Sequence, residues 1–134
     1  VIRNEEVGNM ASATSVYPVV RTKLVELQRQ LAERENVIMD GRDIGTVVLP
    51  SANVKIYLTA SSAVRAKRRY DELTAKGVDC DIKEIEQDII ERDYRDMHRE
   101  TSPLKQAEDA VLLDSSDLDI DGVVAAMKKI IKEA

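Results

Sequence analysis

Apolar residues recur along most of this chain at the three- and four-residue spacing of an amphipathic helix. A first helix-compatible segment covers Glu5–Tyr17, and Pro18 ends or restarts the helix because proline cannot continue one. After Pro18, a stripe of apolar residues predicts a helix of about four turns that packs against a partner. Asn36 breaks this helix. Its apolar positions follow one another at spacings of four, three and four: Val20, Leu24, Leu27 and Leu31.

Three more helices are predicted in the second half of the chain. One follows a cap at Ser61 or Ser62 and ends at Lys76-Gly77, since glycine is the usual residue past the last turn. Another begins at a cap on Asp81 and runs to about Arg99, before Ser102-Pro103 stops it. The closing helix has an apolar face that comprises Ile120, Val123, Val124, Met127, Ile130 and Ile131.

Three short apolar runs predict strands at Val37–Met39, Val54–Leu58 and Ala110–Leu113. The first is wholly apolar, which is typical of a strand that is covered on both faces in a parallel sheet. Strands that alternate with helices predict an α/β fold with a parallel sheet. Three strands make a small sheet next to the usual five or six. We therefore expect one incomplete domain over residues 1–134, with part of its sheet supplied by residues outside this chain.

Composition narrows the classes of protein that this chain can belong to. With 134 residues, 43 % hydrophobic and 34 % charged, it fits one globular domain and neither a disordered tail nor a membrane protein. A net charge of −5 and an aromatic content of 3 % argue against nucleic acid as a partner. The single Cys80 allows no internal disulfide and no metal set, and the cytoplasm is the expected compartment.

The first predicted strand leads directly into charged residues. Asp40, Arg42 and Asp43 follow its carboxyl end, and in open α/β sheets ligands bind in the crevice beyond the strand ends. Gly41 permits a tight turn or a close approach of a ligand. The alternative is an ordinary charged surface turn, which is common in proteins.

On the helix predicted after Asp81, one stripe of side chains is apolar at first and charged toward the end of the helix. Ile82, Ile85 and Ile89 are followed on the same line by charged residues, namely Arg92, Asp96 and Arg99. Either the last two turns overhang solvent with an Arg92–Asp96 pair, or they face a polar cleft. In such a cleft two guanidiniums would hold a phosphate or ring acceptors, and the carboxylate would accept hydroxyl protons. His98 lies beside the stripe without a second histidine and is expected to be exposed rather than a base.

A basic cluster lies on the preceding helix. Arg65, Arg68 and Arg69 share a face at spacings i, i+3 and i+4. Their alternatives are a solvated face or a phosphate-binding face, and arginine rather than lysine favours phosphate.

Five segments together resemble the carboxyl-terminal part of bacterial cytidylate kinases, which are nucleoside monophosphate kinases of the P-loop class. In the family's order, they are IRNEEVGNMAS, DGRDIGTVVLP, VKIYLTASSAVRAKRR, ERDYRDMHRE and VLLDSS. The resemblance implies a three-layer P-loop kinase fold, in which a parallel sheet is flanked by helices. Residues 1–5 would be the tail of the monophosphate-binding insertion, and residues 62–100 a helical lid. The implied reaction is transfer of the ATP γ-phosphate to CMP or dCMP, giving CDP or dCDP.

The resemblance also implies roles for residues around CMP. The cytosine ring would be read by Ser12, Arg21 and Asp43, which fits the donor and acceptor pattern of cytosine. The ribose hydroxyls would be held by Arg92 and Asp96. The monophosphate would be held by Arg42 and Arg99.

The remaining implied roles concern ATP. Arg65, Arg68 and Arg69 would lie in a mobile lid over the ATP phosphates, and Asp40 would lie near the Mg²⁺ shell, with contact through water as one option. The catalytic set would be Arg42, Arg99 and Arg68, because phosphoryl transfer depends on positioning and positive charge. No general base is needed for an acceptor that is already an ionised phosphate.

One family motif is absent from this sequence. No segment fits G-x-x-x-x-G-K-[ST], the loop that cradles nucleotide phosphates. We therefore expect this chain to be inactive alone and to need the missing amino-terminal part of the same domain as its partner, with CMP or dCMP and ATP as ligands and no membrane. The alternative is a catalytically silent α/β domain whose arginines bind an anion or a partner protein.

Overall fold

The computed structural model describes residues 5–14 and 17–134, and it describes only the backbone of Glu5, Glu6, Asn9 and Ser12. The prediction for residues 1–5 therefore falls almost entirely outside the described residues. The elements, in chain order, are α1 (Glu5–Thr14), α2 (Pro18–Arg34), the π-helix η1 (Ile44–Val48), β1 (Ile56–Thr59), α3 (Ser62–Ala75), α4 (Ile82–His98), β2 (Val111–Asp114) and α5 (Ile120–Glu133).

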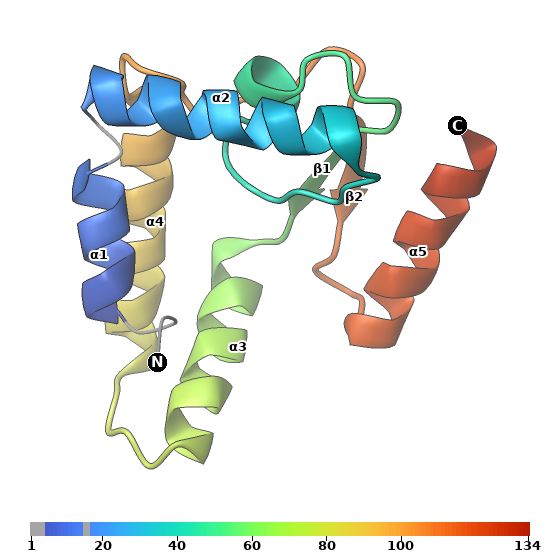
Figure 1. Ribbon diagram of the computed structural model, residues 1–134. Helices are drawn as coiled ribbons and strands as arrows, with labels where there is room; N and C mark the ends of the chain where they lie inside the picture. The colour runs from blue at the N-terminus through green and yellow to red at the C-terminus, as the bar shows by residue number, and fades with distance from the viewer. Residues whose placement is uncertain (1–4, 15–16) are drawn as a thin grey trace.

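The sheet confirms the predicted α/β class. β1 and β2 are parallel neighbours, with Ile56 opposite Val111 and Thr59 opposite Asp114. The connection between them contains α3 and α4, which run side by side below and to the left of the sheet in Figure 1. Two residue pairs join these helices: Ser62 donates to Glu86 at 2.9 Å, and Arg65 is paired with Asp93.

The prediction of a strand at Val37–Met39 is wrong. This segment has no regular secondary structure, and the Ile38 side chain is 97 % exposed. A strand is stabilised by hydrogen bonds to a neighbour, and the only sheet among the described residues pairs β1 with β2 alone. The sheet therefore has two strands here rather than three, and the charges at 40–43 do not follow a strand end.

Helix boundaries follow local chemistry closely. The Ser61 hydroxyl accepts from the amide of Val64 at 3.3 Å, and the Asp81 carboxylate accepts from the amide of Lys83 at 2.6 Å, so both predicted caps are confirmed. Gly77, just past α3, has φ +73°, a conformation that favours glycine. Asp119 caps α5 by accepting from the amide of Gly122 at 2.8 Å.

The hydrophobic core is small for a chain of this length. The buried apolar residues among those described are Val48, Ala60 and Ala66. The accessible surface is 10458 Å², whereas a compact protein of 15.0 kDa exposes about 7,000 Å². The predicted apolar stripe of α2 is 41 to 50 % exposed, so its expected packing is only partly realised. Among the described helices, none is both long and apolar enough to cross a membrane.

Candidate functional site

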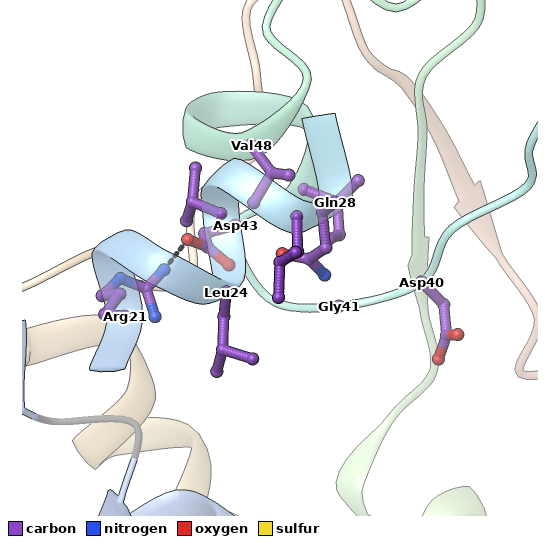
Figure 2. Close-up of a pocket in the computed structure, with 10 residues that line it drawn as sticks. Arg21, Leu24, Gln28, Asp40, Gly41, Asp43 and Val48 are labelled. Atoms are coloured by element: carbon purple, nitrogen blue, oxygen red, sulfur yellow. Dashed lines mark hydrogen bonds and ion pairs between the residues drawn. The ribbon is translucent and has the colours of Figure 1, made fainter. Parts of the chain in front are cut away.

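An ion pair joins α2 to the loop that precedes η1. The Arg21 guanidinium donates through Nη2 to Oδ2 of Asp43, as the dashed line in Figure 2 shows. The two side chains are only 17 % and 11 % exposed. Burial and the nearby positive charge of Arg99 lower the pKa of Arg21, but an arginine remains charged throughout the physiological range. The carboxylate of Asp43 therefore lies against a buried, permanent positive charge.

The π-helix η1 fixes the backbone on which Asp43 stands. The Asp43 carbonyl accepts from the amides of Val47 at 2.8 Å and Val48 at 3.2 Å. Arg29, about two turns after Arg21 on α2, donates to the carbonyls of Val48 at 2.8 Å and Val47 at 2.7 Å. These are end carbonyls that a helix leaves without partners. The helix α2 thus holds this segment at two points.

A second ion pair joins the same loop to the end of α4. The Arg42 guanidinium donates through Nε to Oδ2 of Asp96. Arg92 is farther away, with its Nε 4.0 Å from the same oxygen, and its side chain is 58 % exposed. The charged end of the apolar stripe therefore does not simply overhang solvent, because Asp96 is only 15 % exposed and faces Arg42.

The turn after α4 brings two arginines to one residue. Arg21 Nε donates to the hydroxyl of Ser102 at 2.9 Å, and Arg99 Nε donates to the carbonyl of Ser102 at 2.7 Å. The backbone of Ser102 has φ +50°, in the left-handed region that is unfavourable for a residue other than glycine. The turn closes back onto α4, since the amide of Leu104 donates to the carbonyl of Asp96 at 2.8 Å.

Together with the backbone that joins Arg42 to Asp43 and Asp96 to Arg99, these contacts form a closed circuit, which we call the polar ring. It begins and ends at the carboxyl-terminal end of α4, and it consists of Asp96, Arg42, Asp43, Arg21, Ser102 and Arg99. Beside it, a pocket of about 290 Å³ is lined by Arg21, Asp43 and apolar side chains of α2 and η1, including Leu24 and Val48. This is close to the lower limit of the volumes found for small-molecule sites.

Asp40 lies apart from the polar ring. It is exposed and lines the same pocket, but Figure 2 shows its carboxylate pointing away from the Arg21–Asp43 pair. Magnesium in phosphoryl-transfer sites is held by one or two carboxylates together with substrate phosphates. No group of three His, Cys, Asp or Glu residues that could hold a metal occurs in the described part of the chain. Asp40 therefore fits the role of a single ligand and not of a metal cage.

The three arginines of α3 do not converge on a common point. Arg65 makes two bonds to Asp93, at 3.0 and 2.5 Å, and the bond to this carboxylate raises its pKa. Arg68 donates to the carbonyls of Ser115 at 2.6 Å and Leu118 at 3.1 Å. Arg69 pairs with Glu72 of its own helix at 3.0 Å. The predicted shared face exists along the helix, but each guanidinium has a different intramolecular partner.

Three other residues are singled out by the sequence: Ser12, His98 and Cys80. The side chain of Ser12 lies outside the described residues, so its predicted role stays a prediction. His98 is exposed, as expected, with its ring stacked on Tyr94 at 4.1 Å between centroids. Cys80 is a free thiol.

Sequence comparisons identify the family of this chain. Residues 1–133 match the sequence model of the family described as "Cytidylate kinase". The chain belongs to the cytidylate kinase family. It is 55 % identical, over 127 residues, to proteins named "Cytidylate kinase" from Streptococcus pneumoniae strain Hungary19A-6 and from S. pneumoniae serotype 2 strain D39. The match covers 95 % of this chain and 57 % of each of those relatives, so the chain spans little more than half the length of the cytidylate kinases that it matches.

Sequence reasoning missed two residues that organise the site in this member of the cytidylate kinase family. Arg29 secures η1, and its one signal is its position eight residues after Arg21, on the same side of α2. Ser102 joins Arg21 to Arg99, and the sequence marks it only as the residue before Pro103, where the helix had to end.

Proposed function

We propose that this chain provides the CMP- or dCMP-binding part of a cytidylate kinase, which transfers the γ-phosphate of ATP to its acceptor. The observation that carries the proposal is the polar ring, because five of the seven residues predicted to bind CMP belong to it. Membership of the cytidylate kinase family supports the choice of acceptor. Because the match covers only 57 % of each relative, we propose the kinase activity for the complete enzyme and not for this chain alone.

The Arg21–Asp43 pair would read the cytosine base. Cytosine has an exocyclic amine that donates and ring atoms that accept, so it calls for one carboxylate and one guanidinium. In the pair, Oδ2 of Asp43 is occupied by Arg21, while no hydrogen bond to Oδ1 occurs among the described residues. That oxygen would accept from the amine. Uracil has a carbonyl at the same position and would place an acceptor against this carboxylate.

The Arg42–Asp96 pair and Arg99 would hold the sugar and the monophosphate. Asp96 would accept hydrogen bonds from the ribose hydroxyls, and Arg92 would donate hydrogen bonds to their oxygens. Arg42 and Arg99 would bind the monophosphate, where a planar guanidinium can form two parallel bonds to phosphate oxygens. The terminal nitrogens of Arg99 have no partner among the described residues, so they are available to a ligand.

Positive charge around the transferred phosphoryl group would supply the catalysis. Phosphoryl transfer needs positioning and electrostatic stabilisation more than covalent help. Arg42 and Arg99 would act from the polar ring, and the α3 arginines Arg65, Arg68 and Arg69 would act from a lid. Each of those three would have to exchange its present intramolecular partner for a phosphate oxygen. Mg²⁺, when bound beside Asp40, would neutralise charge on the ATP phosphates.

Calorimetric titration of CMP, UMP and AMP tests the proposal. Two proteins are compared: this chain as it stands, and a chimera in which it replaces the matching 57 % of the S. pneumoniae strain D39 enzyme. We expect the chimera to prefer CMP and to phosphorylate it, and this chain alone to bind CMP weakly or not at all. Lack of a CMP preference in both proteins would overturn the proposal and leave an anion- or partner-binding domain.

The Asp43→Ala variant of the chimera tests the base-reading assignment. We expect its preference for CMP over UMP to fall by at least about fivefold, because one base-reading group is lost. Asp117→Ala is a suitable control, since Asp117 is exposed and lies outside the polar ring. An unchanged CMP preference in Asp43→Ala would disprove the assignment.

A further inference from the structure

Ser102 is the one residue of the polar ring that carries no charge, and two arginines depend on it. Its hydroxyl accepts from Nε of Arg21 at 2.9 Å, and its carbonyl accepts from Nε of Arg99 at 2.7 Å. The two acceptors belong to the same residue, so their separation is limited by covalent geometry and fixed by the conformation of that one residue. The spacing of two guanidiniums from different helices is therefore controlled at a single position.

Without such a link the two arginines would tend to separate. Like charges at short distance repel, and the repulsion is stronger where burial lowers the effective dielectric constant. Arg21 is only 17 % exposed, and the charge of Arg99 contributes to lowering its pKa. Asp43 neutralises Arg21, but nothing among the described residues except Ser102 bonds to the Arg99 side chain.

The backbone of Ser102 is held in an unfavourable conformation by its surroundings. A residue with a side chain at φ +50° costs of order 1–3 kcal/mol and persists only where neighbouring contacts fix it. Three hydrogen bonds hold this turn in place. Arg21 and Arg99 each donate to Ser102, and the amide of Leu104 donates to the carbonyl of Asp96. Such strained residues concentrate at binding sites.

We propose that Ser102 is a positioning residue that sets the separation of Arg21 and Arg99, and thereby the distance between the base-reading and phosphate-binding ends of the site. Ser102 would thus favour a pyrimidine nucleoside monophosphate, whose distance from base to phosphate matches the distance between the two arginines. This inference rests on the proposed function, because it takes Arg21 as the base contact and Arg99 as the phosphate contact. The link between the two arginines can be measured without any nucleotide.

The nucleotide-free test uses the chimera without any ligand and the arginine Nε–Hε signals in ¹H–¹⁵N spectra. We expect Ser102→Ala to accelerate solvent exchange of the Arg21 Hε by at least about tenfold, since a hydrogen bond to a charged group is lost. Exchange of the Arg99 Hε should be unchanged, because its acceptor is a backbone carbonyl. Thr101→Ala removes the adjacent exposed hydroxyl, which has no partner among the described residues, and should change neither signal. Unchanged Arg21 exchange in Ser102→Ala would overturn the proposed link.

The kinetic test uses the chimera and compares Ser102→Ala with Ser102→Gly. Both lack the hydroxyl, but glycine adopts φ +50° without strain, whereas alanine keeps the strain that serine carries there. Positioning predicts that both variants raise KM for CMP by about tenfold, with kcat and KM for ATP changed by less than about twofold. Only their stabilities should differ. A purely structural role would make the glycine variant behave like the wild type, and that result would overturn the inference.

The two failures can be told apart. If the wild-type chimera does not act on CMP, the proposed function fails, and the exchange experiment still decides whether Ser102 positions Arg21. If the wild-type chimera phosphorylates CMP but neither Ser102 variant changes KM for CMP, the function stands and the positioning role is wrong.

Discussion

The polar ring and the apolar interior of this chain differ in how complete they are. Around the ring, each carboxylate faces an arginine, and no buried polar side-chain atom in the described part of the chain lacks a hydrogen-bond partner. The apolar interior has only three buried hydrophobic residues in that same part, while large residues of α2, the sheet and α5 stay about half exposed. The polar contacts come from segments within this chain, whereas the apolar faces require more surface than the chain itself provides.

The largest expected effect concerns those apolar faces. Exposed surfaces of this extent favour association, so the apparent mass should rise with concentration in sedimentation. The double variant Leu27→Gln, Leu31→Gln should weaken the association, because both side chains are about half exposed on one stripe of α2. Lys23→Gln with Glu26→Gln, on the same helix, is the control and should associate like the wild type. A monomer at every concentration would refute the expectation.

On the polar side, Asp43→Ala should cost about 3 kcal/mol of unfolding free energy. The substitution leaves Arg21 largely buried without its counter-ion. Urea unfolding followed by circular dichroism measures the change. Glu26→Ala is the matched control, since its pair with Lys23 is exposed and should contribute less than about 0.5 kcal/mol. Equal losses of unfolding free energy in the two variants would show that the Arg21–Asp43 pair stabilises the fold no more than an exposed ion pair does.

A smaller effect is expected in the core. Val48 is 2 % exposed, and Val48→Ala should cost about 2 kcal/mol through lost burial and the remaining cavity. Val19, in α2, is 83 % exposed, so Val19→Ala should change the free energy of unfolding by less than about 0.5 kcal/mol. The same urea experiment compares the two valines. If Val48→Ala were as mild as Val19→Ala, η1 would not be part of the core.

The smallest effect is a pH dependence near the sheet. Hydrogen bonds from Lys55, at 2.7 and 2.9 Å, lower the pKa of Asp109 below its ordinary value of 3.8. Its stabilising contribution is therefore complete above the ordinary carboxyl range, and it is lost as the pH falls through the lowered folded-state value. Unfolding midpoints should fall less steeply on acidification in Asp109→Asn than in the wild type. Asp117→Asn, at an exposed position, is the control, and identical acid profiles for all three proteins would contradict the expectation.

Local elements were predictable because their signals are short-range. Ser61, Asp81 and Gly77 marked helix ends, and each does so in the structure. These interactions join residues two to four positions apart, so no knowledge of the fold is required. The parallel relation of β1 and β2 was also predictable, because two apolar runs separated by helices favour a crossover.

The failures arose where a segment depends on a distant partner. Val37–Met39 has the composition of a buried strand, but strand formation needs a neighbour, and the segment has none among the described residues. η1 could not be predicted either, because its bond from the amide of Leu49 to the carbonyl of Ile44 depends on a rare i to i+5 geometry.

For the site, the sequence by itself determined which charged residues were available and, through the family resemblance, which nucleotide they are proposed to bind. Only the tertiary structure decided their partners: Asp43 pairs with Arg21, Asp96 pairs with Arg42 more closely than with Arg92, and the α3 arginines separate. The reason is physical. A helical stripe fixes the direction of a side chain, but an ion pair also needs its partner at a distance of about 3 Å, and packing between remote segments alone sets that distance.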